Sequence, residues 1–228
     1  QRINARLNSV KLPLTTNFRC GKSIITKAQE INPKIRADVN AIDGEVVNMP
    51  ISEAKDKLLP GDVMLSRINS PLVKLFFNLA RMGKPVSFVG RDYWLMLQCR
   101  IASWEPESIA QLLEINKTFK LERGNWLKSK NISTSRLNDE CDTIEILCNE
   151  CVTVRDLYNK LKQIKDSETN NPKERIRLSS VHKFKGLEAK NVYVLNDTLS
   201  FDGKENLNIS YVAYTRAREK LILVAGKP

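Results

Sequence analysis

The chain has 228 residues, and its hydrophobic content of 42% is enough for a sizeable folded core. Its 37 Lys and Arg residues outnumber its 26 Asp and Glu residues, so the formal net charge is +11, which favours a polyanionic partner such as nucleic acid. Five cysteines, an odd number, argue against a disulfide framework and predict a reducing compartment. No long apolar run and no signal peptide occurs, so we expect a cytoplasmic or nucleoid-associated protein, nuclear in a eukaryote, without membrane contact and not secreted. Because the chain begins at Gln1, we also expect a part of a longer protein.

Short strands and helices alternate over the first 103 residues. Short apolar runs predict strands, and apolar residues spaced by three and four predict helices. The expected strands are 11–15, 46–49, 62–66 and 86–89. The expected helices are 21–31, a short helix before Pro60, 71–82 and 91–103. Such alternation is typical of a parallel sheet with helices on both faces.

Residues 104–172 have a different pattern, in which strand-like runs disappear and helical spacing dominates. Alternation then returns in the last part of the chain. The expected elements there are strands at 177–181 and 191–195, a helix at 206–219 and a final strand at 221–225. The sequence therefore predicts one sheet, formed by residues 1–103 and 173–228 and interrupted by a helical insert.

The tripeptide Gly21-Lys22-Ser23 has the ending of a phosphate-binding P-loop, G-x-x-x-x-G-K-[ST]. The first glycine of that motif would stand at position 16, which is Thr16. Threonine does not adopt the required turn as freely as glycine, so the backbone N–H groups would not curl around a phosphate. We therefore interpret these residues as the start of a helix, and a P-loop kinase is disfavoured.

Three segments resemble motifs of the UvrD/Rep group of superfamily 1 DNA helicases. Residues 177–188, RLSSVHKFKGLE, are similar to motif V, T-x-H-x-x-K-G-L-E, and residues 211–217, YVAYTRA, are similar to motif VI, Y-V-A-x-T-R-A. Motif IV, L-x-x-N-[YF]-R-S, is matched by residues near the start of the chain: Leu14, Asn17, Phe18 and Arg19, with Cys20 in place of the serine.

Two weaker segments agree with the same family. Residues 62–69, DVMLSRIN, are similar to its strand followed by R-x-N, and residues 84–94, KPVSFVGRDYW, are similar to its P-[YF]-x-x-x-G-G-x-x-F-F segment. All five segments occur in the family's order.

The resemblance implies an α/β fold, with the RecA-like parallel sheet of helicase domain 2A in residues 1–103 and 173–228. The insert at 104–172 would be a 2B-like subdomain, much shorter than the family's. The implied function is the C-terminal motor half of an ATP-dependent single-stranded-DNA translocase or DNA helicase, moving 3′ to 5′, in repair or replication. No Walker A or B motif occurs, so ATP with Mg²⁺ would be bound mainly by an N-terminal RecA-like domain of the same polypeptide. Alone, this portion would be inactive.

The resemblance also implies roles for residues near the nucleotide. Arg19 and Arg216 would be arginine fingers, which offset charge that develops on the γ-phosphate. Glu188 would contact the nucleotide ribose, and Gly186 would let the backbone come close. The alternatives are surface ion pairs for the arginines and an ordinary exposed carboxylate for Glu188.

Contacts with single-stranded DNA, or with a junction of single- and double-stranded DNA, are implied for a second set: Arg67, Asn69, Ser180, His182 and Lys183. Tyr93 and Trp94 are candidate stacking surfaces for bases, with a place in the core as the alternative. For Arg67 and Asn69 the alternative is a solvated strand end, and for His182 a structural hydrogen-bonding role. One histidine does not build a zinc site, so no metal site is expected.

Cys141, Cys148 and Cys151 have a spacing that suggests metal binding, yet no fourth ligand lies nearby in the sequence. We expect free thiols on an acidic helix. Two other functions stay open: the motor portion of a helicase-nuclease recombination subunit, and a non-catalytic DNA-binding module with relic motor motifs.

Overall fold

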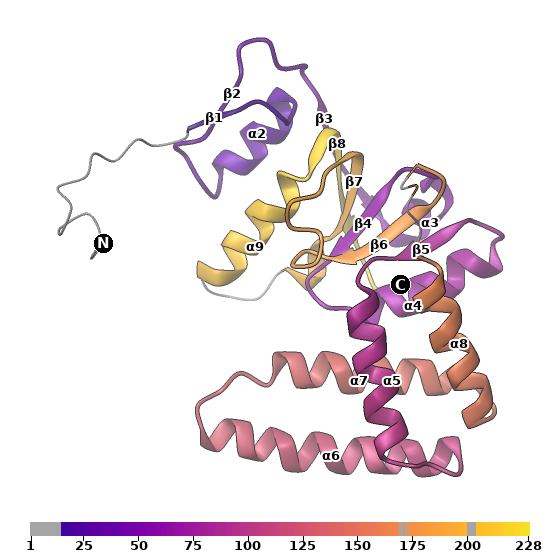
Figure 1. Ribbon diagram of the computed structural model, residues 1–228. Helices are drawn as coiled ribbons and strands as arrows, with labels where there is room; N and C mark the ends of the chain where they lie inside the picture. The colour runs from indigo at the N-terminus through magenta and orange to yellow at the C-terminus, as the bar shows by residue number, and fades with distance from the viewer. Residues whose placement is uncertain (1–14, 169–170, 172, 200–203) are drawn as a thin grey trace.

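A six-stranded parallel sheet forms the centre of the computed structural model, which describes residues 15–168, 171, 173–199 and 204–228 (Figure 1). The strands lie in the order β3-β8-β7-β4-β6-β5. Their bounds are β3 (Glu45–Pro50), β4 (Val63–Ser66), β5 (Val86–Phe88), β6 (Ile176–Ser180), β7 (Ala189–Leu195) and β8 (Ala217–Ala225). β4 lies between β6 and β7, and β5 pairs with β6. Strands from both sides of residues 104–172 therefore share one sheet, as predicted.

Helices cover both faces of this sheet, because successive strand residues are apolar and point to opposite faces. In β4, Met64 packs into the core that includes α3 (Ile51–Lys57), α4 (Ser70–Arg81) and α5 (Arg91–Ser103). Its neighbours Val63 and Leu65 pack into the opposite core, beneath α2 (Lys22–Gln29) and α9 (Lys204–Tyr214). The predicted α/β class with helices on both faces is confirmed.

The start of the chain forms a small separate sheet of two parallel strands, β1 (Thr16–Asn17) and β2 (Arg36–Ala37), with α2 between them. Lys22 and Ser23 lie in the first turn of α2, which confirms that they are helix residues. The predicted strand at 11–15 lies, except for Thr15, outside the described residues, and so does Leu14 of the motif IV match.

The described residues of the predicted insert form three helices: α6 (Ile109–Ser129), α7 (Ser135–Asn149) and α8 (Val154–Asp166). α7 packs on α4, and α8 packs on α5. Their apolar residues, such as Ile144 and Leu161, belong to the same core as the sheet. The helical character is as expected, while the division of the chain at residues 104 and 172 into subdomains stays a prediction. Cys141 and Cys148 are both buried, and burial raises the pKa of these thiols to about 11 and about 12.

The predicted division between the last helix and the last strand is wrong. The helix expected at 206–219 ends at Tyr214, and β8 begins at Ala217 instead of 221. Residues 217–220 have the composition of a helix, but Ala217 pairs with Ala189 of β7, and Lys220 pairs with Glu45 of β3. Pairing with two neighbouring strands overrides the local preference. Within the described residues, no helix combines the length and apolar character needed to cross a bilayer.

Candidate functional site

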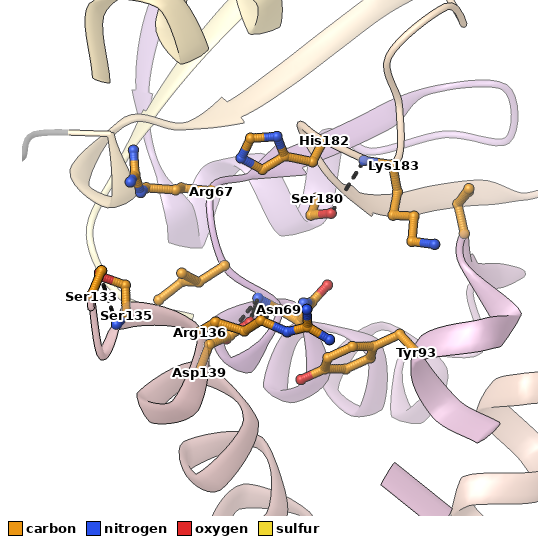
Figure 2. Close-up of a pocket in the computed structure, with 12 residues that line it drawn as sticks. Arg67, Asn69, Tyr93, Ser133, Ser135, Arg136, Asp139, Ser180, His182 and Lys183 are labelled. Carbon is orange, nitrogen blue, oxygen red and sulfur yellow. Dashed lines mark hydrogen bonds between the residues drawn. The ribbon is translucent and has the colours of Figure 1, made fainter. Parts of the chain in front are cut away.

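A cavity of about 660 Å³ lies where β4, β5 and β6 end at the same edge of the sheet (Figure 2). The carboxyl ends of parallel strands are a common place for binding sites. All six residues predicted to contact DNA line it: Arg67, Asn69, Tyr93, Ser180, His182 and Lys183. The structure therefore brings together residues that are up to 116 positions apart in the chain, from 67 to 183.

The loop after β4 is held in place by hydrogen bonds on both sides. The backbone N–H of Arg67 donates to the Thr198 hydroxyl over 3.1 Å. The backbone N–H groups of Asn69 and Ser70 each donate to the carboxylate of Asp139, at 2.8 Å. Asp139 belongs to α7, so a residue of the insert caps the N-terminus of α4, where the helix dipole favours a negative charge.

Asp139 also determines how Asn69 faces the cavity. The Asn69 side-chain amide donates through Nδ2 to Asp139 Oδ2 over 2.9 Å. Burial raises the pKa of Asp139 above its ordinary value, although the hydrogen bonds from Asn69 and Ser70 oppose this shift.

His182 and Lys183 lie in the turn after β6, and both are exposed. The Lys183 backbone N–H donates to the Ser180 hydroxyl over 3.4 Å, and its ammonium lies 3.5 Å from Asp92. Its aliphatic stem passes Gly90, where an added Cβ would lie 3.5 Å from Lys183 Cγ. Gly90 has a φ of 115°, a conformation that suits glycine and begins α5.

The two aromatic candidates differ in their placement. Trp94 is buried in the core, edge-on to Phe88 with ring centroids 4.6 Å apart, so its core alternative is confirmed. Tyr93 is half-buried and lines the cavity, and its hydroxyl donates to the Thr143 hydroxyl over 3.0 Å. Burial raises the pKa of Tyr93, so it stays a neutral phenol at the wall of the cavity.

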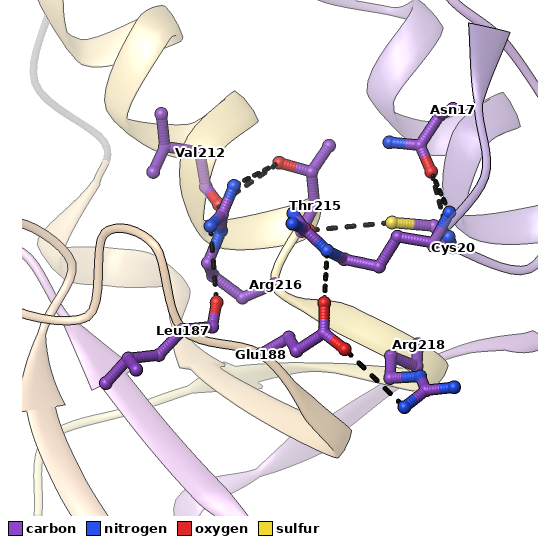
Figure 3. A network of polar contacts seen from close by, with 9 residues as sticks. Asn17, Cys20, Leu187, Glu188, Val212, Thr215, Arg216 and Arg218 are labelled. Atoms are coloured by element: carbon purple, nitrogen blue, oxygen red, sulfur yellow. Dashed lines mark hydrogen bonds and ion pairs between the residues drawn. The ribbon is translucent and has the colours of Figure 1, made fainter.

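A second cluster of predicted residues lies at the amino ends of β7 and β8, on the opposite edge of the sheet (Figure 3). Arg19 Nε lies 2.5 Å from Glu188 Oε2, and Arg218 Nη1 lies 3.5 Å from Glu188 Oε1. Arg19 Nη1 also donates to the carbonyl of Thr215 over 3.4 Å. Thus Arg19, Arg216 and Glu188 are brought together around the turn between α9 and β8.

Arg216 is held by neutral oxygen atoms. Its Nε donates to the carbonyl of Val212 over 3.0 Å, and its Nη1 donates to the carbonyl of Leu187 over 3.2 Å. Burial and the nearby Arg19 charge lower the pKa of Arg216, although an arginine remains charged at neutral pH. Three guanidinium groups, of Arg19, Arg216 and Arg218, stand against the one carboxylate of Glu188, so the cluster has a positive charge that an anion would offset.

Stability does not explain this arrangement. The Arg19 and Glu188 side chains are 33% and 39% exposed. An ion pair so accessible to water stabilises a fold by only about 0–1 kcal/mol. The surface-pair alternative accounts for the contact between Arg19 and Glu188, but Arg216 is held by carbonyl groups instead.

Residues 181–188 connect the two clusters. They leave β6 at the cavity, cross the sheet face that packs on α9, and enter β7 beside Arg216. Phe184 is fully buried and anchors this crossing, while Gly186 has a φ of 93° with open space around it. His182 and Lys183 therefore face the cavity, and Glu188 faces the arginines.

The arginine cluster suits the anionic oxygens of a phosphate better than a metal ion. Its donor groups are guanidinium N–H groups, which match phosphate in a forked geometry. In the described part of the chain, no group of three or more His, Cys, Asp or Glu residues is placed to hold a metal ion. These residues would fit the phosphate end of ATP, and they offer no ligand set for Mg²⁺.

Six lining residues were not predicted as site residues. Ile68 and Val89 are apolar neighbours of predicted ones, and four polar residues come from the insert: Ser133, Ser135, Arg136 and Asp139. Their local signal is weak, since a polar loop before an acidic helix is typical of many surfaces. They reach the cavity because α7 packs on α4.

Residues 175–224 match the family model described as the UvrD-like helicase C-terminal domain. No curated protein matches the chain. Among solved structures, the chain is similar to the C-terminal domain of a possible DNA helicase from Lactobacillus plantarum WCFS1, at 13% identity and a TM-score of 0.45, over 92% of this chain and 88% of that chain. The matched residues include both the motif V and the motif VI segments. Residues 175–224 are therefore similar to the UvrD-like helicase C-terminal domain.

Proposed function

We propose that this chain is the C-terminal motor half of an ATP-dependent DNA helicase or single-stranded-DNA translocase that moves 3′ to 5′. The observation that carries the proposal is the pairing of two sites on one sheet. The cavity gathers six predicted DNA contacts, the opposite edge gathers two arginines, and residues 181–188 join them. A motor needs both a nucleotide site and a DNA site, because ATP turnover must change the affinity of the protein for DNA.

On the nucleotide side, ATP would supply the phosphoryl group, held with Mg²⁺ mainly by an N-terminal RecA-like domain of the same polypeptide. Arg19 and Arg216 would approach the γ-phosphate across the cleft between the two domains. Their guanidinium groups would stabilise the charge that develops during transfer. Glu188 would turn to the ribose, and its ion pair with Arg19 would then break. The chain alone would hydrolyse no ATP.

On the DNA side, the cavity offers complementary groups to a single strand. Lys183 would pair with backbone phosphates, and the Ser180 hydroxyl and His182 would donate or accept hydrogen bonds. Tyr93, which lines the cavity, would stack on a base, which contributes about 1–3 kcal/mol where such stacking is made. Non-specific binding along the backbone suits a protein that moves along the strand.

The decisive experiment compares wild type with Arg216→Ala in the complete polypeptide. We expect ATP hydrolysis stimulated by single-stranded DNA to fall by about 10³-fold or more, because a finger contributes about 10³–10⁵ in turnover. ATP binding should be largely kept, since the other domain holds most of the nucleotide.

Arg155→Ala is the matched control, because Arg155 is an exposed arginine on α8. It should leave turnover unchanged. Similar rates for wild type and Arg216→Ala would refute the finger, and a wild type without stimulated hydrolysis would favour a DNA-binding module with relic motifs.

A further inference from the structure

The cavity has a second wall, which the helical insert provides. Ser133, Ser135 and Arg136 line it together with the predicted DNA contacts of the sheet. They precede or begin α7 and lie outside the segment that matches the helicase family model. In Figure 2, Arg136 extends from α7 into the space between the insert and the end of β6.

Arg136 is oriented by a buried carboxylate. Its Nε lies 2.8 Å from Glu140 Oε1, one helical turn further along α7. Glu140 is only 5% exposed, and its other oxygen accepts from Arg100 Nη1 of α5 over 2.5 Å. The carboxylate thus cannot swing freely, and it holds the guanidinium group by one edge.

The other edge of the guanidinium group faces the cavity. The Arg136 side chain is 84% exposed, and among the described residues no protein acceptor contacts its Nη1 or Nη2. Two parallel N–H groups on a fixed plane match two oxygens of a phosphate. An arginine held by Nε and open at both Nη atoms is therefore prepared for an anion.

The surrounding charges favour an anionic strand. Arg67, His182 and Lys183 line the same cavity from the sheet side. The acidic residue of the lining, Asp139, already accepts hydrogen bonds from Asn69 and Ser70. Cations thus stand on two walls with the cavity between them.

We propose that Arg136 binds a backbone phosphate of the single strand in this cavity, with Glu140 as its positioning residue. The insert is then a wall of the DNA track, so the strand is held between the insert and the sheet. This inference rests on the proposed DNA-binding function.

The test measures binding of a fluorescein-labelled oligothymidine to the full 228-residue chain by fluorescence anisotropy across a series of salt concentrations. Loss of a charge-assisted contact should weaken the binding of Arg136→Ala by about tenfold. The slope of log affinity against log salt should become shallower by about 0.7, which is the value for one phosphate contact on a single strand. The variant should keep the wild-type circular dichroism spectrum, because the side chain is largely exposed.

Arg136→Lys tests the role of Glu140. Lysine keeps the charge but lacks the Nε edge that Glu140 holds, so the salt slope should return to the wild-type value while affinity recovers only in part. Affinity equal to wild type would overturn the positioning role of Glu140.

Two controls separate the outcomes. Arg155→Ala removes an exposed arginine of α8 and should bind like wild type, whereas Lys183→Ala removes a contact of the sheet wall and should weaken binding. If Arg136→Ala binds like Arg155→Ala while Lys183→Ala is weaker, the insert wall is refuted and the proposed function stands. If the wild type itself does not bind, the proposed function fails and this inference fails with it.

Discussion

Gly21 and Gly44 meet backbone to backbone, and this contact explains why a glycine precedes Lys22. A Cβ on Gly21 would lie 2.7 Å from the Cα of Gly44, closer than real Cβ atoms come. The Gly21 N–H donates to the carbonyl of Arg218 over 2.8 Å, which joins α2 to β8 beside the arginine cluster. At the scale of one residue, the feature that suggests a P-loop is therefore a packing requirement.

Gly21→Ala should lower the free energy of unfolding by about 1–3 kcal/mol, because the added methyl group meets backbone that cannot move aside cheaply. Urea unfolding followed by circular dichroism measures this change. Gly124→Ala is the matched control: its added Cβ would lie 3.9 Å from Leu137 Cδ2, an ordinary contact inside α6. It should stabilise the protein by about 0.5–1 kcal/mol through helix propensity. Equal effects of the two substitutions would contradict the close contact.

At the scale of the element, α4 of the sheet domain and α8 of the insert begin by different means. α4 receives its cap from Asp139 of another helix. α8 has a local capping box, in which Thr153 Oγ1 accepts from the Asp156 N–H over 3.1 Å and Asp156 Oδ2 accepts from the Thr153 N–H over 2.9 Å. The cap of α8 can therefore be recognised in a short stretch of sequence, whereas the cap of α4 cannot.

The capping box makes part of the stability depend on pH. Hydrogen bonds from the Thr153 side chain and backbone lower the pKa of Asp156 below 3.8. The folded state therefore favours the ionised carboxylate, and this contribution is fully present above the ordinary pKa. It is lost as the pH falls through the lower pKa of the folded state.

Wild type should accordingly exceed Asp156→Asn in urea midpoint near neutral pH, and the difference should shrink below pH 3.8. In a Thr153→Ala background most of the pH-dependent difference should disappear, since Thr153 supplies the largest cause of the shift. A difference that stays constant between neutral and acidic pH would refute this account.

At the scale of the whole molecule, the insert and the sheet share one core. Leu161 of α8 is 1% exposed and belongs to the same apolar cluster as Trp94 and Ile101 of α5. The sheet face beneath α4 and α5 is therefore completed by residues of the insert. In such a cooperative unit, the loss of an apolar contact in the insert lowers the free energy of unfolding of the whole chain.

Leu161→Ala should lower the stability of the entire chain by about 2–5 kcal/mol, the usual cost of a large-to-small core substitution. Tryptophan fluorescence and far-ultraviolet circular dichroism should report the same single transition. Leu121→Ala is the control, because Leu121 of α6 is 61% exposed and the change should stay within about 0.5 kcal/mol. A separate early transition in Leu161→Ala would mean that the insert folds independently.

The α/β class and most elements, within a few residues, can be predicted from the amino-acid sequence alone. α5, for example, was predicted at 91–103 and spans Arg91–Ser103, because its boundary signals are local. The motif V and VI segments are also contiguous runs, so their likeness to a helicase family is readable without a fold. Features of this kind depend on consecutive residues, so they can be recognised before the fold is known.

The contacts between these elements become visible in the folded chain and not in the sequence. Residues 217–220 became strand because two neighbouring strands supply hydrogen-bond partners, so Arg216 stands in a turn and not on a helix. Asp139 and Arg136 reached the cavity because α7 packs on α4, about 70 residues away in the chain. Such contacts arise from burial of apolar surface between distant segments, and no local periodicity records which segments will pair.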